Sequence, residues 1–164
     1  MAEAYVAAGS NVRPRASLRR ALALLRDEFP GLRASPAYAN KAVGFEGDDF
    51  VNLVAAFATD RPLPEVLATL KAIERALGRV PGAPKWGPRT LDLDLLLYGD
   101  LIGRFDGATL PHRDLATRAW VLGPLAALEP GLRDPVTGER IGELWARFDR
   151  GAHPLVEISL EGAD

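Results

Sequence analysis

The sequence has no cysteine, one methionine and two histidines among its 164 residues. The absence of cysteine excludes a disulfide framework, thiolate chemistry and a zinc ribbon. Any metal ion must therefore be held by oxygen atoms or by His112 and His153. No apolar run reaches the length that spans a membrane, and the N-terminal residues lack the basic and hydrophobic regions of a secretory signal. We expect a cytoplasmic chain with no membrane partner.

Neither sign of charge dominates, because the formal net charge is −2. This balance argues against a broad nucleic-acid footprint, so any anion-binding site must be local. The apolar share of 48% and the charged share of 26% are ordinary for a globular domain. No repeat, low-complexity segment or linker divides the chain. We therefore expect a single domain over residues 1–164.

One block, KWGPRTLDLDLLLY, carries the strongest chemical signal. Its side chains alternate, so Asp92 and Asp94 point to one face of a strand and the leucines between them to the other. Two such carboxylates can converge on one metal ion or bridge a pair, and oxygen ligands suit Mg²⁺. A rigid Gly-Pro turn brings Trp86 and Arg89, a bidentate phosphate donor, beside the acids. Taken alone, an Asp-x-Asp pair is more often the solvated face of an amphipathic strand.

Apolar spacing predicts alternating strands and helices. Strands are predicted at residues 4–8, 32–40, 50–58 and 90–98, and helices at residues 15–29, 62–78, 121–128 and 140–147. This order predicts an α+β fold, a ferredoxin-like βαββαβ sandwich with a helical C-terminal tail. We expect a four-stranded antiparallel sheet with both helices on one face and the opposite face free for ligands.

Several further side chains have two interpretations. Phe50 and Asn52 share a strand face by the two-residue period and could line a site, and the alternative for the aromatic residues Phe50 and Trp120 is that they belong to the core. Glu74 lies on the apolar stripe of its helix, where a carboxylate is usually part of an ion pair. His112 follows a proline and is either functional or a solvated loop histidine.

Several motifs recur together along nearly the whole chain: Gly9-Ser10-Asn11, Tyr38, Gly44, Phe50-x-Asn52, Gly78-Arg79, Trp86-Gly-Pro-Arg-Thr-Leu-Asp-Leu-Asp94, and Pro111-His112 with Arg118 and Trp120. This set resembles the hydroxymethyldihydropterin pyrophosphokinases, a family of folate-pathway enzymes. An Arg followed three and five residues later by Asp is far more specific than a lone Asp-x-Asp. The family's ferredoxin-like fold agrees with the predicted order of elements.

The resemblance implies transfer of a diphosphoryl group from ATP, the co-substrate, to the hydroxymethyl group of 6-hydroxymethyl-7,8-dihydropterin, with release of AMP. It implies that Asp92 and Asp94 hold two Mg²⁺ ions in a two-metal clamp. It also implies that Arg79, Arg89 and His112 assist catalysis by contacting the phosphates.

The resemblance further implies two small-molecule sites. Its ATP-binding positions are Leu70, Glu74, Arg79, Trp86, Arg89, Leu95, Thr109, His112, Arg113 and Arg118. Its pterin-binding positions are Gly9, Asn40, Lys41, Ala42, Val43, Phe50, Asn52, Trp86, Asp92 and Trp120. The flat ring would lie between two aromatic side chains, an arrangement that suits stacking. We expect the protein to be a monomer. We also expect it to have no nucleic-acid partner.

The chain departs from the family pattern in the loop at 40–43, which lacks the family's prolines, in the segment 44–52, which is a residue shorter, and at three single positions. Pro81 stands where many members have a second phosphate-binding Arg, Lys71 where Gln is common, and Arg113 where an aromatic residue often follows the His. Arg113 has the reach to replace the missing phosphate ligand. The alternatives are that Arg113 stacks on the adenine or is a solvated loop residue.

Two other classes share parts of the pattern. A polymerase-β-type nucleotidyltransferase pairs a Gly-Ser turn with an Asp-x-Asp strand close in sequence, whereas here two helices and two strands separate Gly9-Ser10 from Asp92. An RNA-binding module of ferredoxin-like topology would carry aromatic residues within a basic face, and this chain is acidic. Tight, salt-sensitive retention of RNA on a filter would favour the RNA-binding module.

Overall fold

The computed structural model describes residues 1–40, 49–78, 90–152 and 154–163. Its elements are β1 (Ala2–Ser10), α1 (Pro14–Glu28), β2 (Arg33–Ala34), β3 (Ala37–Asn40), β4 (Phe50–Thr59), α2 (Leu63–Ala76), β5 (Asp92–Tyr98), β6 (Gly103–Phe105), β7 (Ala108–Leu110), α3 (Ala119–Leu128), α4 (Ile141–Ala146) and β8 (Val156–Ile158). The predicted order of strands and helices is confirmed as far as β5. The strand predicted at 32–40 is divided at Pro36, which has no N–H to donate to a ladder.

The main sheet has six strands in the order β5-β1-β4-β3-β8, with β2 also paired to β4. Every pairing among these strands is antiparallel. The predicted four-stranded sheet was therefore too small, and the prediction of an α+β fold with an antiparallel sheet and helices is confirmed. One of the two extra strands arises because the predicted strand 32–40 is divided into β2 and β3. The other, β8, has three residues, too few to produce a readable hydrophobic period.

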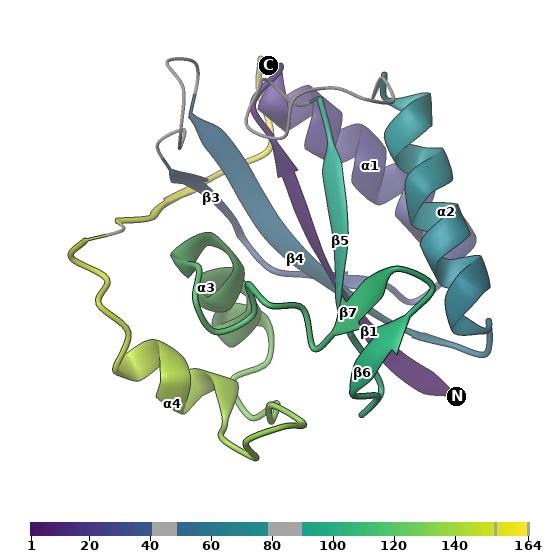
Figure 1. The fold of residues 1–164 in the computed structure, drawn as a ribbon. Coiled ribbons are helices and arrows are strands. Elements are labelled where there is room, and N and C mark those ends of the chain that lie inside the picture. Colours follow the sequence, from purple (N-terminus) through teal and green to yellow (C-terminus); the bar gives the residue numbers. More distant parts are fainter. Residues whose placement is uncertain (41–48, 79–89, 153, 164) are drawn as a thin grey trace.

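Helices α1 and α2 cover one face of the sheet (Figure 1). The alternate residues Ala4, Val6 and Ala8 of β1 point to this face and are almost completely buried, as are Leu18 and Leu25 of α1. Proline at the start of both helices suits a first turn whose N–H groups have no partner within the helix. This first core fixes α2 beside β5, which matters for the site below.

The opposite face of the sheet is not free for ligands along its whole length. The prediction of a free face was therefore wrong. Helix α3 packs on half of it, with α4 against α3 (Figure 1). Tyr5, Val54 and Ala56 point to this side and form a second core with Leu122 and Leu125 of α3. The two-residue period of the strands predicts which side chains point away from the first core. Because these side chains are apolar, a second layer must pack on them. The other half of this face carries polar groups.

Strand β5 contains a β-bulge near its middle. Tyr5 of β1 pairs with Leu97, whereas the next residue, Val6, pairs with Leu95, so Leu96 is an extra residue in β5. Leu96 and Leu97 both belong to the second core, and Leu95 belongs to the first. The run of three leucines is thus buried on both faces of the sheet.

A tight hairpin joins β6 to β7. Asp106 and Gly107 occupy the turn, and both have positive φ, 49° and 84°, as a two-residue type I′ turn requires. Leu110 is buried in the first core and Phe105 packs against it. The hairpin was not predicted, although the Asp-Gly pair was a signal for it.

A polar network links β1, β2 and the end of α3. The Tyr5 hydroxyl donates to the Glu129 carboxylate at 2.7 Å. Arg33 bridges Glu129 at 3.1 Å and Glu3 at 2.6 Å. Burial, followed by the bond to Glu129, raises the pKa of Tyr5 well above its ordinary value.

No helix among the described residues is long and apolar enough to cross a membrane.

Candidate active site

The polar half of the second sheet face forms one row across four strands. Tyr38 of β3 pairs with Asn52 of β4, Asn52 pairs with Gly9 of β1, and Gly9 pairs with Asp92 of β5. Side chains of directly paired residues point to the same face. Phe50 lies beside Asn52 by the two-residue period and pairs with Asn40. The predicted pterin-binding residues on these strands are therefore neighbours.

Gly9 leaves space for the Asn52 side chain. A Cβ atom at Gly9 would lie 2.4 Å from Asn52 Oδ1, closer than such atoms approach in proteins. The Asn52 amide nitrogen donates to Asn40 Oδ1 at 2.6 Å. This bond fixes the amide of a half-buried residue in one orientation. Asn52 can thus present a defined pattern of donors and acceptors to a ligand.

Asp92 and Asp94 leave the same face of β5, while Leu91, Leu93 and Leu95 are buried, as the alternation predicted. Asp92 is half-buried beside Gly9, and Asp94 is exposed and lines a cavity. The described residues contain no group of three His, Cys, Asp or Glu side chains that could hold a metal ion. Mg²⁺ usually takes one or two protein carboxylates and completes its shell with phosphates and water, so this oxygen donor pair fits it.

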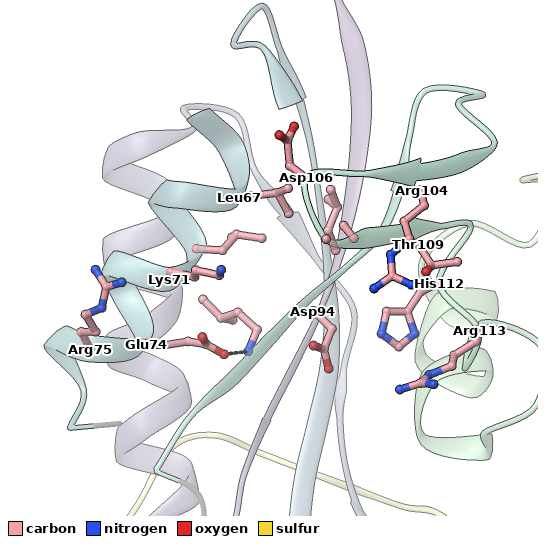
Figure 2. Close-up of a pocket in the computed structure, with 15 residues that line it drawn as sticks. Leu67, Lys71, Glu74, Arg75, Asp94, Arg104, Asp106, Thr109, His112 and Arg113 are labelled. Atoms are coloured by element: carbon pink, nitrogen blue, oxygen red, sulfur yellow. Dashed lines mark hydrogen bonds between the residues drawn. The ribbon is translucent and has the colours of Figure 1, made fainter. Parts of the chain in front are cut away.

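The cavity has a volume of about 690 Å³ and lies between α2 and β5 on one side and the β6–β7 hairpin on the other. Among its lining residues are seven predicted to bind ATP or metal: Leu70, Glu74, Asp94, Leu95, Thr109, His112 and Arg113. Figure 2 shows Asp94 between the α2 side and the side that carries His112 and Arg113. The fold therefore assembles these residues from four separate segments.

Glu74 joins the two walls that α2 and β5 contribute. Its Oε2 atom accepts the backbone N–H of Leu93 at 2.8 Å, drawn as a dashed line in Figure 2. Leu93 neighbours both acids of β5, so this bond ties the helix to the strand at the acids. Glu74 thus lines the cavity and also has a structural contact.

Backbone contacts hold His112 in position. Its N–H donates to the carbonyl of Leu96, the extra residue of the bulge, at 2.9 Å. The Asp114 N–H donates to His112 Nδ1 at 3.1 Å. A neutral imidazole that accepts at Nδ1 carries its proton on Nε2 and can donate from there. His112 lines the cavity, so this donor is available to a ligand.

Arg118 and Trp120 are not part of the cavity lining. Arg118 Nε lies 3.8 Å from Asp114 Oδ1, and its guanidinium lies 5.5 Å from the centre of the Trp120 ring. Trp120 is the second residue of α3 and packs, partly buried, against the second core. The two residues are connected to His112 through Asp114, which lies within 3.9 Å of His112 Nδ1.

Part of the predicted site lies outside the described residues. It comprises Lys41, Ala42, Val43, Arg79, Trp86 and Arg89, together with Pro81.

The sequence assigned no role to four charged residues of the cavity lining: Lys71, Arg75, Arg104 and Asp106. Lys71 and Arg75 lie one turn apart on α2, beside the predicted Leu70 and Glu74. Arg104 and Asp106 belong to the unpredicted hairpin. The Asp-Gly turn was the one signal that could have found them.

A family model for the 7,8-dihydro-6-hydroxymethylpterin-pyrophosphokinases (HPPK) matches residues 5–130. The chain belongs to the HPPK family. The matched region includes every described site residue named above, and the HPPK match ends just after α3.

Relatives of this HPPK-family chain are found in several bacteria. The Pseudomonas aeruginosa 2-amino-4-hydroxy-6-hydroxymethyldihydropteridine pyrophosphokinase is 42% identical over 147 residues, 87% of this chain and 89% of that protein. The Synechocystis protein of the same name is 40% identical over 117 residues, 71% of this chain and 60% of that protein.

Solved HPPK-DHPS structures share the fold. One, in complex with substrates, has a TM-score of 0.69 at 14% identity and covers 92% of this chain. The wild-type Plasmodium falciparum HPPK-DHPS has a TM-score of 0.66 at 13% identity and covers 89% of it. This chain spans 44% of the length of each of those chains.

Proposed function

We propose that this chain transfers the diphosphoryl group of ATP to the hydroxymethyl group of 6-hydroxymethyl-7,8-dihydropterin, a step of folate biosynthesis. Membership of the HPPK family over residues 5–130 is the observation that carries the proposal. HPPK enzymes use ATP as co-substrate, and relatives at 34% to 42% identity bear the name of this activity.

ATP would occupy the cavity between α2 and the hairpin. Its volume of about 690 Å³ suits a small-molecule ligand. Leu67, Leu70 and Leu95 supply apolar surface for the base, and His112 and Arg113 supply donors for the phosphates. As part of the same proposal, Arg79, Arg89 and Arg118 bind phosphate oxygens and Trp86 lies beside both substrates.

The pterin would lie on the polar row of the second sheet face. Asn52, oriented by Asn40, presents an amide that matches the donor and acceptor edge of the ring. Phe50 shares that face, and Trp120 lies in the first turn of α3, the helix that covers its other half. Stacking on two aromatic rings suits a flat heterocycle. Asp92 is paired to Gly9 in this row, so the pterin would lie next to the acids.

The transfer needs in-line geometry and neutralised charge more than a strong base. The pterin hydroxymethyl oxygen forms a bond to the β-phosphorus of ATP. The bond from that phosphorus to the oxygen bridging to the α-phosphate breaks, its electron pair leaves with AMP, and the hydroxyl proton passes to solvent. His112 is suited to donate from Nε2 to the phosphate oxygens nearest the departing AMP.

Two Mg²⁺ ions are part of the proposal, held by Asp92 and Asp94. When bound, they would neutralise phosphate charge and orient the attacking hydroxyl. The acids lie where the pterin row meets the ATP cavity, since Asp92 pairs with Gly9 and Asp94 lines the cavity. This arrangement supports the proposal that the two acids hold metal ions between the two substrates.

We further propose that residues 1–164 act as one cytoplasmic, monomeric pyrophosphokinase domain that binds no nucleic acid. The strand order β5-β1-β4-β3 supports a ferredoxin-like core to which β8 and the β6–β7 hairpin are added.

Nucleotide products test the function directly. AMP should appear only when MgATP and the reduced pterin are both present, measured by separating AMP, ADP and ATP by chromatography. Formation of ADP in place of AMP would identify an ordinary kinase and contradict the proposal.

The acids are tested by isosteric substitution. Asp92→Asn and Asp94→Asn should keep the fold and lower turnover more than about 100-fold, because metal-ion charge stabilisation is worth several kcal/mol and about 1.4 kcal/mol is tenfold. The exposed Asp100→Asn, beyond the end of β5, is the matched control and should be unchanged. Near-normal turnover in the two site variants would remove the acids from the chemistry.

A further inference from the structure

Arg104 is a basic side chain in the ATP cavity that the sequence motifs do not include. It lies in the middle of β6 and pairs with Thr109 of β7. Both line the cavity, and Figure 2 shows Arg104, His112 and Arg113 on the side opposite α2. Arg104 thus belongs to the same wall as two residues already proposed to contact phosphate.

The hairpin determines which way Arg104 points. Its two-residue turn at Asp106 and Gly107 fixes the pairing, and successive side chains of a strand alternate between faces. Phe105 packs against the first core and Leu110 is buried in it, so Arg104 and its partner Thr109 point the other way, into the cavity. This orientation follows from core packing and does not depend on a salt bridge.

The charge around Arg104 favours an anion. Within the described part of the chain, Arg104 forms no ion pair and no side-chain hydrogen bond. Among the described residues, four basic side chains line the cavity, Lys71, Arg75, Arg104 and Arg113, against three acids, Glu74, Asp94 and Asp106. This described part of the lining is therefore net positive in a chain whose formal net charge is −2. A guanidinium presents a planar fork that matches phosphate oxygens.

We propose that Arg104 binds the phosphate chain of ATP, as a second guanidinium on the wall that carries His112 and Arg113. The inference rests on the proposed function for the identity of the nucleotide. It assigns to the β6–β7 hairpin a role in ligand binding, because the hairpin delivers Arg104 opposite the α2 side of the cavity. Arg104 increases the affinity for a nucleotide through contacts with its phosphate groups. It makes no contact with the base.

Calorimetry with MgATP and with adenosine tests this directly. Arg104→Ala should weaken MgATP binding about 10- to 100-fold, the range expected for one charge-assisted hydrogen-bonding group, and should change adenosine binding less than threefold. Arg104→Lys should recover part of the MgATP affinity, since it keeps the charge and loses the fork. The matched control is Arg20→Ala, an exposed arginine on α1 away from the cavity, which should bind both ligands normally.

Two results would overturn the inference. MgATP affinity within threefold of wild type would mean that Arg104 is only solvated, and equal losses for MgATP and adenosine would mean that it contacts the base or ribose. If circular dichroism shows that Arg104→Ala does not fold, Arg104→Gln, which keeps most of the stem, decides by the same two criteria. Failure of the proposed function is seen separately, as absence of pterin-dependent AMP from the wild-type enzyme.

Discussion

Gly9→Ala tests the row of polar residues on the second sheet face. Gly9 is buried in β1 between Asn52 and Asp92. Its backbone is not in the positive-φ region, so alanine introduces no backbone strain there. The added methyl group would instead lie 2.4 Å from Asn52 Oδ1. We expect the Asn52 amide to turn away and pterin binding to weaken.

The size of the effect follows from how far the amide must move. An ordinary contact begins at 3.4 Å, so the oxygen must shift by about 1 Å. That shift breaks the 2.6 Å bond to Asn40. A neutral hydrogen bond contributes about 0.5–1.5 kcal/mol and an off-rotamer side chain costs about as much, so the free energy of unfolding should fall by about 1–3 kcal/mol. Pterin affinity should fall about tenfold, with MgATP affinity retained.

A double-mutant cycle isolates the clash. Urea denaturation and calorimetry would be applied to Gly9→Ala, Asn52→Ala and the double variant. Asn52→Ala removes the atom that clashes, so adding Gly9→Ala should then cost little stability. Gly131→Ala is the matched control, since its added methyl group has no neighbour within 4 Å. An equal cost of Gly9→Ala with and without Asn52 would refute the reasoning, as would a parallel loss of MgATP affinity.

Three further predictions concern other parts of the fold. Glu74→Ala should lower the free energy of unfolding by about 1–3 kcal/mol, because it leaves a β5 N–H without its acceptor, whereas Glu74→Gln should retain most of the stability in urea denaturation. Above about pH 10 the unfolded Tyr5 ionises while the folded hydroxyl, bonded to Glu129, keeps its proton, so stability should fall as pH rises and Tyr5→Phe should flatten that fall in pH-dependent denaturation. Phe50→Ala and Trp120→Ala should each weaken pterin binding by about 1–3 kcal/mol in calorimetry, with little change for ATP; equal losses for both ligands would assign the rings to the fold.

The long elements were predictable because hydrophobic period and turn residues agree along them. Helices α1 and α2 and strand β4 follow directly from such patterns. The opposite faces of Asp92 and Leu93 also follow, since a strand has a fixed period of two. These features depend on residues close in sequence, so no knowledge of packing was needed.

Features that depend on packing between distant segments were not predictable in the same way. The short strands β6, β7 and β8 have three residues each, too few for periodicity. The cover over Tyr5 comes from α3, more than a hundred residues later in the chain. Arg104 enters the cavity because Phe105 packs against the first core, a tertiary contact that no local pattern reveals.

The bulge in β5 couples the length of that strand to the position of His112. Deletion of Leu96 would leave an uninterrupted alternation in which Leu97 still pairs with Tyr5 and Tyr98 still turns to the first core. A comparison of sequences by hydrophobicity alone would therefore score the deletion as neutral. It would nevertheless remove the carbonyl that accepts the His112 N–H. In any graft or redesign of this site, the spacing from Asp94 to Tyr98 must be kept along with the residue types.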